Sequence, residues 1–438
     1  MKISTPVLAS ALALAALAAC DGDPPPVPMR DAGRRDAGPG AMDARVPDAA
    51  LPDGGGGRDG EVPDRDAGSV GCTVSAENVY KLATDVNPSE RNVGLAATSN
   101  GFGVVWNETR EGRPDLFGIR IASDGTLGGE VRLTDTAAIE NPPSLIALGT
   151  EWLAAWVDNT AATGFEVRAQ GLASDLSPTG SPSDLTSTAA LFEDNPTLFA
   201  GSDGALLAWV QDDMVASTRQ ARARPLASDG SPSGSAQDAS ASDATPGQLA
   251  LAELSGGPVL VWAEATGGTG DVILQPLADD GGTRGSSEVI SAEGNADGTV
   301  DAALGPSGGA VVFGTLVGGV RSEIRFRALD EDGGLVGDER ILTEAPVQGR
   351  GASIARFAGG YAVAYRRFGA GEGAAVQLLL VSALGDVLDE IEVATVPEQG
   401  GRTTLRVSGD GQIGIAWSDR GSTETQIRAA VVACGSGA

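Results

Sequence analysis

The sequence predicts an all-β fold, a seven-bladed β-propeller of four-stranded blades, and three observations support this prediction. An apolar octet with an aromatic residue near its end recurs seven times, first as GFGVVWNE at 101–108. The aromatic residues follow one another every 50 to 53 positions, and so steady a period indicates an array of one supersecondary unit. No convincing helix-period stretch interrupts the array. The seven aromatic anchors are Trp106, Trp156, Trp209, Trp262, Phe313, Tyr365 and Trp417.

The first repeat shows how each blade is built. Residues 93–98, 102–107, 116–122 and 129–135 favour four short strands separated by Gly, Asn and Asp turns. The segment SDGT at 123–126 is a natural tight hairpin between the third and fourth strands. Similar turns recur at 228–231, 279–282 and 331–334. Four strands in about 50 residues, repeated radially, describe a propeller blade.

The two ends of the array predict that the ring closes on itself. After Trp417 the chain supplies one more strand, at 426–433, so the last blade lacks its fourth strand. The segment NVYKLATD at 78–85 has the pattern of a fourth strand and precedes the first complete repeat. We therefore expect the N-terminal strand to complete the last blade. The array resembles seven-bladed propellers over about 78–434, and no named propeller subfamily is matched.

The N-terminus predicts export and lipid attachment. One positive charge precedes an apolar run from Val7, which is too short for a stable membrane span and favours a signal peptide. Its end, Leu17-Ala18-Ala19-Cys20, resembles the lipobox of bacterial lipoproteins. That resemblance implies a signal peptide over 1–19 and an acyl anchor on Cys20, with the membrane contacted through this anchor only.

A tether is expected between the anchor and the folded domain. Residues 20–71 are rich in Pro, Gly and Asp and contain no aromatic residue, a composition that favours disorder. The tail resembles those of lipoproteins from myxobacteria, and we expect the outer membrane or the cell surface rather than the inner membrane. Asp21 resembles the inner-membrane retention signal of enteric lipoproteins, which leaves that alternative open. The propeller is assigned to 72–438.

The remaining two cysteines predict a disulfide that closes the ring. If Cys20 carries lipid, Cys72 and Cys434 are left, and a pair in an exported protein favours a disulfide. Both flank the strands that should close the last blade, so the disulfide would lock the ring. The alternative is two free thiols.

Composition narrows the possible partners and chemistry. The formal net charge is −29 and Lys occurs at Lys2 and Lys81 alone, so nucleic acid and anionic lipid headgroups are poor partners. The chain has no His, which excludes Ser-His-Asp catalysis, His metal ligands and His pH switches. The acidity suits a basic partner or a cation, and it also suits simple solubility. We expect a monomer without a resident cofactor.

Acidic residues follow the aromatic anchors and define a candidate binding rim. A carboxylate stands two positions after the anchor at Glu108, Asp158, Glu264 and Asp419, and Asp212 is displaced by one. The fifth and sixth repeats have Thr315 and Arg367 there instead, and Arg366 and Arg367 could pair with the acids. The rim could receive Ca²⁺ or a basic partner, or it could be an ordinary solvated loop edge. The anchors themselves fit packing between blades better than ligand stacking.

The function predicted from these features is display of a non-catalytic binding or scaffold module. The partner would be an envelope protein or an extracellular polysaccharide. The alternative is a carbohydrate-active hydrolase or lyase that uses rim carboxylates, because such enzymes need two carboxylates and no His. A purely structural surface protein is the third possibility.

Overall fold

The structure is a computed structural model that describes residues 71–435, except 86–92, 111, 136–142, 160–163, 189–190, 202–203, 265–269, 320 and 370–372. The described residues belong to one compact unit, Arg65–Ala438. The signal peptide, Cys20 and the tether, all predicted from the sequence, lie outside the described residues. Within the described part of the chain, the sole helix is the one-turn 3₁₀ helix η1 (Ala76–Asn78), and the remaining elements are strands.

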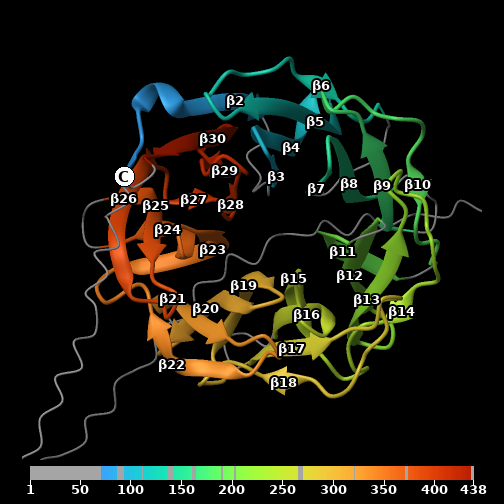
Figure 1. Ribbon diagram of the computed structural model, residues 1–438. Coiled ribbons are helices and arrows are strands. Elements are labelled where there is room, and N and C mark those ends of the chain that lie inside the picture. The colour runs from blue at the N-terminus through green and yellow to red at the C-terminus, as the bar shows by residue number, and fades with distance from the viewer. Residues whose placement is uncertain are drawn as a thin grey trace, which may run out of the picture. The chain divides into compact units, whose positions relative to one another are not determined.

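Seven antiparallel sheets follow one another around a ring, which confirms the predicted propeller (Figure 1). In each of the first six blades the strands lie in chain order from the centre outwards. The first blade contains β3 (Gly94–Thr98), β4 (Gly101–Arg110), β5 (Arg113–Ala122) and β6 (Val131–Arg132). The second contains β7 (Ser144–Leu148), β8 (Glu151–Asp158), β9 (Glu166–Leu172) and β10 (Ser183–Asp184). The third contains β11 (Phe192–Ala200), β12 (Ala205–Asp213), β13 (Thr218–Leu226) and β14 (Gln237–Asp238). The fourth blade contains β15 (Pro246–Leu254), β16 (Gly257–Glu264), β17 (Val272–Pro276) and β18 (Glu288–Val289). The fifth contains β19 (Ala296–Gly305), β20 (Gly308–Val317), β21 (Arg321–Leu329) and β22 (Leu335–Ile341). The sixth contains β23 (Gln348–Phe357), β24 (Gly360–Phe368), β25 (Ala374–Val381) and β26 (Val387–Val396).

The seventh blade is assembled from both ends of the domain, as the sequence predicts. It contains β27 (Gln399–Gly400), β28 (Thr404–Val407), β29 (Ile413–Arg420) and β30 (Thr425–Cys434). On the outer side of β30 lie the N-terminal strands β1 (Cys72–Thr73) and β2 (Val79–Asp85). The disulfide between Cys72 and Cys434 is confirmed, with Cα atoms 4.1 Å apart.

Several outer strands are shorter than predicted. The expected fourth strand at 129–135 is reduced to β6, and β10, β14 and β18 also have two residues each. The outermost strand pairs on one side only and packs little apolar surface, so Ser, Gly and Pro are tolerated there. The segments that end with β10 and β14, SPTGSPSD and SPSGSAQD, have this composition.

The core of the propeller lies between blades. Seven apolar clusters are buried, and each combines side chains from two neighbouring blades. One of them joins the last blade to the first, because Trp106 packs there with Ala416 and Ala429. No blade can therefore bury its apolar surface alone, and the ring stabilises every member.

Candidate functional site

The aromatic anchors sit in the clusters between blades. Each of the seven side chains is at most 3% exposed, and each lies in a different cluster. They leave no aromatic surface for a ligand to stack on. Their position follows from the second strand, whose two faces both contact neighbouring blades and exclude water.

In three blades the acidic residue after the anchor accepts a hydrogen bond from the anchor itself. The indole N–H of Trp106 donates to Glu108 at 3.2 Å, and that of Trp156 donates to Asp158 at 3.3 Å. In the fourth blade the same bond, from Trp262 to the Glu264 carboxylate, is 2.9 Å long. Side chains two positions apart share one face of a strand, so the recurring spacing brings each carboxylate to its indole. The carboxylate satisfies an N–H that would otherwise be buried without an acceptor.

Three of the predicted rim carboxylates are interior groups. Glu108, Asp158 and Asp419 are 5%, 1% and 3% exposed, whereas Asp212 and Glu264 are half-buried. The sequence suggested an open loop edge, but the blades close over these side chains because each ends a buried strand. Their part in binding a partner stays a prediction.

Arginines neutralise the buried acids. Arg168 lies 3.1 Å from Asp158, and Arg110 lies 2.6 Å from Glu108. Arg367, also predicted for the rim, pairs with Glu392 on the outer strand at 3.0 Å. A buried carboxylate is expensive unless it is paired and hydrogen-bonded, and these contacts meet that need.

A repeated arginine on the third strand was not anticipated from the sequence. In four blades the residue directly opposite the aromatic anchor is an Arg: Arg168, Arg222, Arg325 and Arg428. Three of them also contact an acid on the fourth strand, at Asp184, Asp238 and Glu339. An Arg 11 to 13 residues after the anchor was the available signal. The aromatic residue, the arginine and the acids together form an internal unit that recurs between blades and stabilises them.

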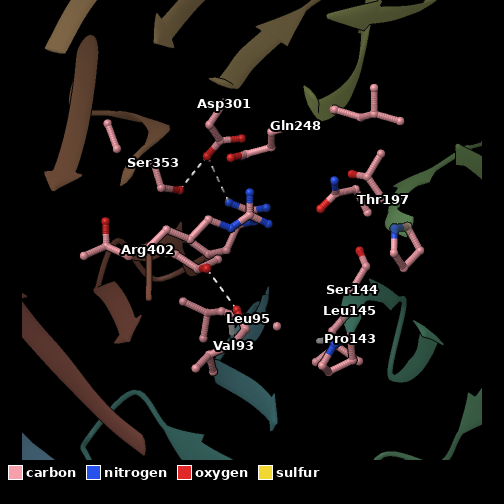
Figure 2. A pocket seen from close by; sticks show the side chains of 18 of the residues that line it. Val93, Leu95, Pro143, Ser144, Leu145, Thr197, Gln248, Asp301, Ser353 and Arg402 are labelled. Atoms are coloured by element: carbon pink, nitrogen blue, oxygen red, sulfur yellow. Dashed lines mark hydrogen bonds and ion pairs between the residues drawn. The ribbon is translucent and has the colours of Figure 1, made fainter. Parts of the chain in front are cut away.

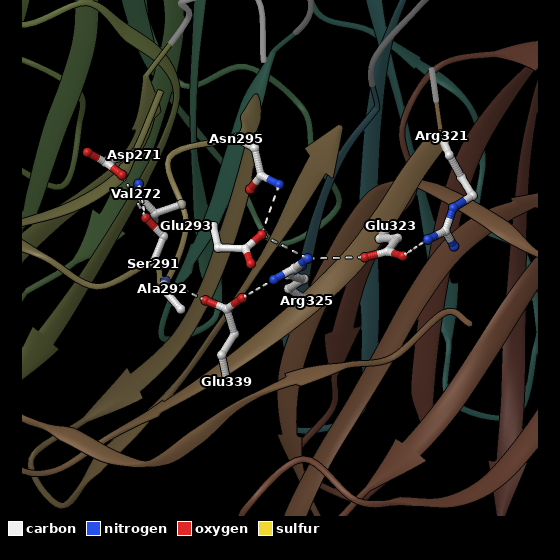
Figure 3. Close-up of polar contacts among 10 residues, drawn as sticks. All are labelled: Asp271, Val272, Ser291, Ala292, Glu293, Asn295, Arg321, Glu323, Arg325 and Glu339. Carbon is white, nitrogen blue, oxygen red and sulfur yellow. Dashed lines mark hydrogen bonds and ion pairs between the residues drawn. The ribbon is translucent and has the colours of Figure 1, made fainter. Parts of the chain in front are cut away.

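The fifth blade carries one such polar network, which Figure 3 shows. Arg325 lies 2.6 Å from Glu339, 3.3 Å from Glu323 and 3.6 Å from Glu293. Burial by itself lowers the pKa of Arg325, but the hydrogen bond with Glu339 and the surrounding carboxylates raise it above the ordinary value. Glu339 also accepts the backbone N–H of Ala292 at 2.7 Å. The network therefore ties the fourth blade to the fifth.

A central channel brings together the first strands of all seven blades (Figure 2). It holds a cavity of about 110 Å³. Asp301, Gln248, Ser353 and Arg402 lie on one side of the cavity, and Thr197 lies across from them. The polar lining residues are Ser144, Asp194, Asn195, Thr197, Gln248, Asp301, Ser353, Arg402, Thr403, Thr404 and Arg406.

Hydrogen bonds between adjacent blades hold the channel wall in shape. The backbone N–H of Leu198 donates to the Ser144 hydroxyl at 3.2 Å, and that of Leu405 donates to Ser353 at 3.0 Å. Between the seventh and first blades, the Thr404 hydroxyl donates to the carbonyl of Val93 at 2.9 Å. Such bonds fix both the spacing of the blades and the positions of the channel hydroxyls.

In the fifth blade, Asp301 takes the position that Ser144 has in the second blade and Ser353 in the sixth. It accepts the hydroxyl of Ser353 and, at 3.1 Å, the backbone N–H of Ile354. Arg406 lies 3.7 Å from it. Three groups therefore surround this carboxylate, which makes it part of the wall rather than a free acid.

A second cavity opens near the disulfide. It has a volume of about 830 Å³ and lies over hairpin turns of the fifth, sixth and seventh blades. Phe357, Tyr361, Leu384 and Cys434 are among its lining residues. Its wall is largely apolar, and Ser307, Asp330, Arg356 and Asp410 are among its polar residues.

Neither a metal cluster nor a membrane helix is found in the described residues. No three acidic, Cys or His side chains among them gather closely enough to hold an ion. The predicted option of Ca²⁺ on the rim stays a prediction. No helix in the described part of the chain has the length and apolarity needed to cross a bilayer.

Among comparisons with known proteins, only the one with solved structures found matches. No protein-family model and no curated protein sequence matches this chain. Among solved structures, the BP39L lectin from Burkholderia pseudomallei is similar, with a TM-score of 0.51 and 12% identity over 77% of this chain and 98% of that chain. The α-L-arabinanase of Penicillium chrysogenum complexed with arabinobiose has a TM-score of 0.48 and 11% identity over 82% and 98%. With the seven sheets described above, the chain is a seven-bladed β-propeller.

Proposed function

We propose that the chain is a lipid-anchored protein of the cell envelope whose propeller is a non-catalytic binding module for a protein or polysaccharide partner. The observation that carries this proposal is the polar, preformed central channel lined by all seven blades. Concave sites with a few fixed polar groups are where small ligands and ligand ends bind. Outer-membrane or cell-surface placement is part of the proposal and rests on the N-terminal sequence.

The state of the carboxylates favours binding over glycoside hydrolysis. Hydrolysis needs two carboxyl groups that face the same substrate, one as acid and one as base or nucleophile. Glu108, Asp158 and Asp419 contact indole N–H groups or arginines inside the blades. In the channel, Asp301 contacts Ser353, Ile354 and Arg406. These acids are engaged in stabilising the fold.

Affinity capture tests the proposal. The full chain is immobilised and exposed to native envelope extract, beside a channel variant, Ser144→Trp, and a rim variant, Asp212→Asn with Glu264→Gln. We expect a retained glycan or protein that the channel variant loses and the rim variant keeps. Loss in the rim variant alone would place recognition on the acidic rim. Circular dichroism confirms that each variant is folded.

Two results would count against the proposal. Capture of nothing by the unmodified chain would contradict a binding role. Release of new reducing ends from envelope polysaccharide by the purified chain would show turnover, and it would support the hydrolase instead.

A further inference from the structure

Among the described residues that line the channel, Arg402 is a charged group without a hydrogen-bond or ion-pair partner. Asp301 is surrounded by three groups, and Asp194 accepts the backbone N–H of Asn195 at 2.8 Å. Arg406 donates to a neighbouring carbonyl and lies near Asp301. Among the described residues, nothing lies within hydrogen-bond or ion-pair distance of the Arg402 guanidinium. Its charge is therefore available to a ligand.

The backbone beneath Arg402 is firmly held. Thr403 donates to the carbonyl of Gly351 through its backbone N–H, at 3.2 Å, and through its hydroxyl, at 2.8 Å. Gly351 has a φ of +60°, and a Cβ there would lie 2.7 Å from the Arg402 Cβ. The glycine therefore allows the two blades to approach closely at this point. The backbone that carries the Arg402 side chain is therefore fixed relative to the channel wall.

Desolvation makes this guanidinium a strong site for an anion. The side chain lies deep in the ring while part of its surface faces the cavity, so it is half-buried. Burial lowers the pKa of Arg402, and the charge of Asp301 acts in the opposite direction. Arg nevertheless stays protonated in proteins, so the channel retains a poorly hydrated cation. An anion that reached it would gain a charge-assisted and potentially bidentate hydrogen bond.

From this geometry we infer that the channel binds the carboxylate of an acidic sugar, with Arg402 as its charged contact. The inference rests on the proposed binding function and names its ligand class. A singly charged carboxylate fits better than phosphate or sulfate, because Asp301 and Asp194 also line the cavity and the chain carries a net charge of −29. A second negative charge would be repelled by all of these.

The neutral lining groups favour a sugar as the carrier of the carboxylate. Ser144 uses its hydroxyl oxygen as an acceptor and still has its O–H to donate. Gln248 donates to the carbonyl of Val300, which leaves its own amide oxygen for a ligand hydroxyl. Thr197 stands across the cavity from Asp301 (Figure 2). At about 110 Å³ the cavity holds several times the ~10–15 Å³ of one water, enough for the carboxylate and nearby hydroxyls of one sugar residue.

Calorimetric titration of the full chain in detergent tests the inference. The probes are galacturonate, galactose, inorganic phosphate and an acetylated dipeptide with a free C-terminus. We expect galacturonate to bind at least tenfold more tightly than the other three. Arg402→Met should reduce that affinity at least tenfold, and Arg402→Lys should restore part of it. Arg340→Met, which removes a half-exposed outer arginine, is the matched control and should leave binding unchanged.

The remaining outcomes overturn the inference. Equal binding of galactose and galacturonate would mean that no carboxylate is recognised. Equal or tighter binding of phosphate would indicate a general anion site, and preference for the dipeptide would indicate a protein partner. Undiminished binding by Arg402→Met would also overturn it. If galacturonate fails to bind while envelope capture succeeds and depends on Ser144, the binding function stands and the ligand class is wrong.

Discussion

The guanidinium of Arg366 in the sixth blade lies 3.2 Å from the carboxylate of Asp419 in the seventh, and these two side chains are only 2% and 3% exposed. Arg366 also donates to the carbonyls of Pro397, at 2.7 Å, and Gln399, at 3.1 Å. Asp419 receives Arg428 from its own blade at 3.4 Å. Arg366 thus joins the sixth blade to the seventh and to the segment that connects them.

Removal of the Arg366 guanidinium should destabilise the propeller strongly. Arg366→Met leaves Asp419 with less compensation in a buried site, and breaking a buried pair in this way costs about 3–5 kcal/mol. We expect the double variant with Asp419→Asn to recover part of the loss. Urea unfolding of the unmodified chain, Arg366→Met, Asp419→Asn and the double variant measures the coupling between the two side chains. Strictly additive effects would show that the two side chains do not interact.

The indole N–H of Trp156 should contribute separately from its ring. Trp156→Ala removes a fully buried ring and should cost about 3–5 kcal/mol. Trp156→Phe keeps much of the ring but leaves Asp158 without this donor, and we expect a smaller loss of about 1.5–3 kcal/mol. The free energies of unfolding of both variants check this order. A negligible loss in Trp156→Phe would mean that the hydrogen bond with Asp158 has no measurable value, and equal losses in both variants would mean that the ring adds nothing beyond it.

Reduction of the disulfide should lower the thermal stability of the propeller. The bond joins residues 362 positions apart, and constraint of so long a loop in the unfolded chain is worth about 6 kcal/mol in the entropic model. Cys72→Ser and Cys434→Ser should each lower the melting temperature as much as dithiothreitol does. Dithiothreitol should have no further effect on either variant. An unchanged melting temperature after verified reduction would refute the stabilising role.

Glu193 should make stability depend on pH. Burial raises the pKa of this carboxyl, and donors from Gln211 and Thr188 offset only part of that effect. The folded state therefore binds the proton more tightly than the unfolded state does. Stability from this group is fully present below its unfolded pKa and falls as pH rises through the raised folded value.

A neutral side chain at position 193 should remove the cost of burying a charged carboxylate. Glu193→Gln should melt at a higher temperature than the unmodified chain at pH 7, and the difference should vanish below about pH 4. Thermal melts from pH 3.5 to 8 measure both curves. A constant difference across this range would mean that titration of Glu193 is not its cause.

The predicted lipid anchor is tested at Cys20, outside the described residues. Cys20→Ser should move the protein from the membrane fraction to the soluble fraction of the envelope. Inhibition of lipoprotein signal peptidase by globomycin should leave an uncleaved precursor of the unmodified chain. Normal processing in the presence of the inhibitor would contradict the lipobox prediction.

The inner part of each blade was predictable from the sequence because it is buried on both faces. Continuous apolar runs such as 102–106 and 413–417 leave a clear periodic signal, and the aromatic anchors fix their count. The outer strands leave a weak signal, since a two-residue strand such as β10 needs little apolar surface. The closing strand at 78–85 was predictable because β2 keeps the fourth-strand pattern.

The candidate site was harder to predict, since it depends on which face of a strand each side chain occupies. Arg366 and Arg367 are adjacent, and alternation along the strand sends one toward Asp419 and the other toward Glu392. Arg402 departs from the repeat and lies between β27 and β28, so periodicity gave no reason to select it. Its importance depends on Asp301 pairing with Arg406 rather than with Arg402, which a sequence alone does not show.

The composite seventh blade has a consequence for protein engineering. The Cα atoms of Cys72 and Cys434 are 4.1 Å apart, so a linker of a few residues could join the two ends directly. The chain could then be opened elsewhere, for example between β14 and β15, where one blade passes to the next. Such a circular permutant would keep every strand pairing and every cluster between blades. The packing between blades depends on their cyclic order and does not depend on the point at which the polypeptide is cut.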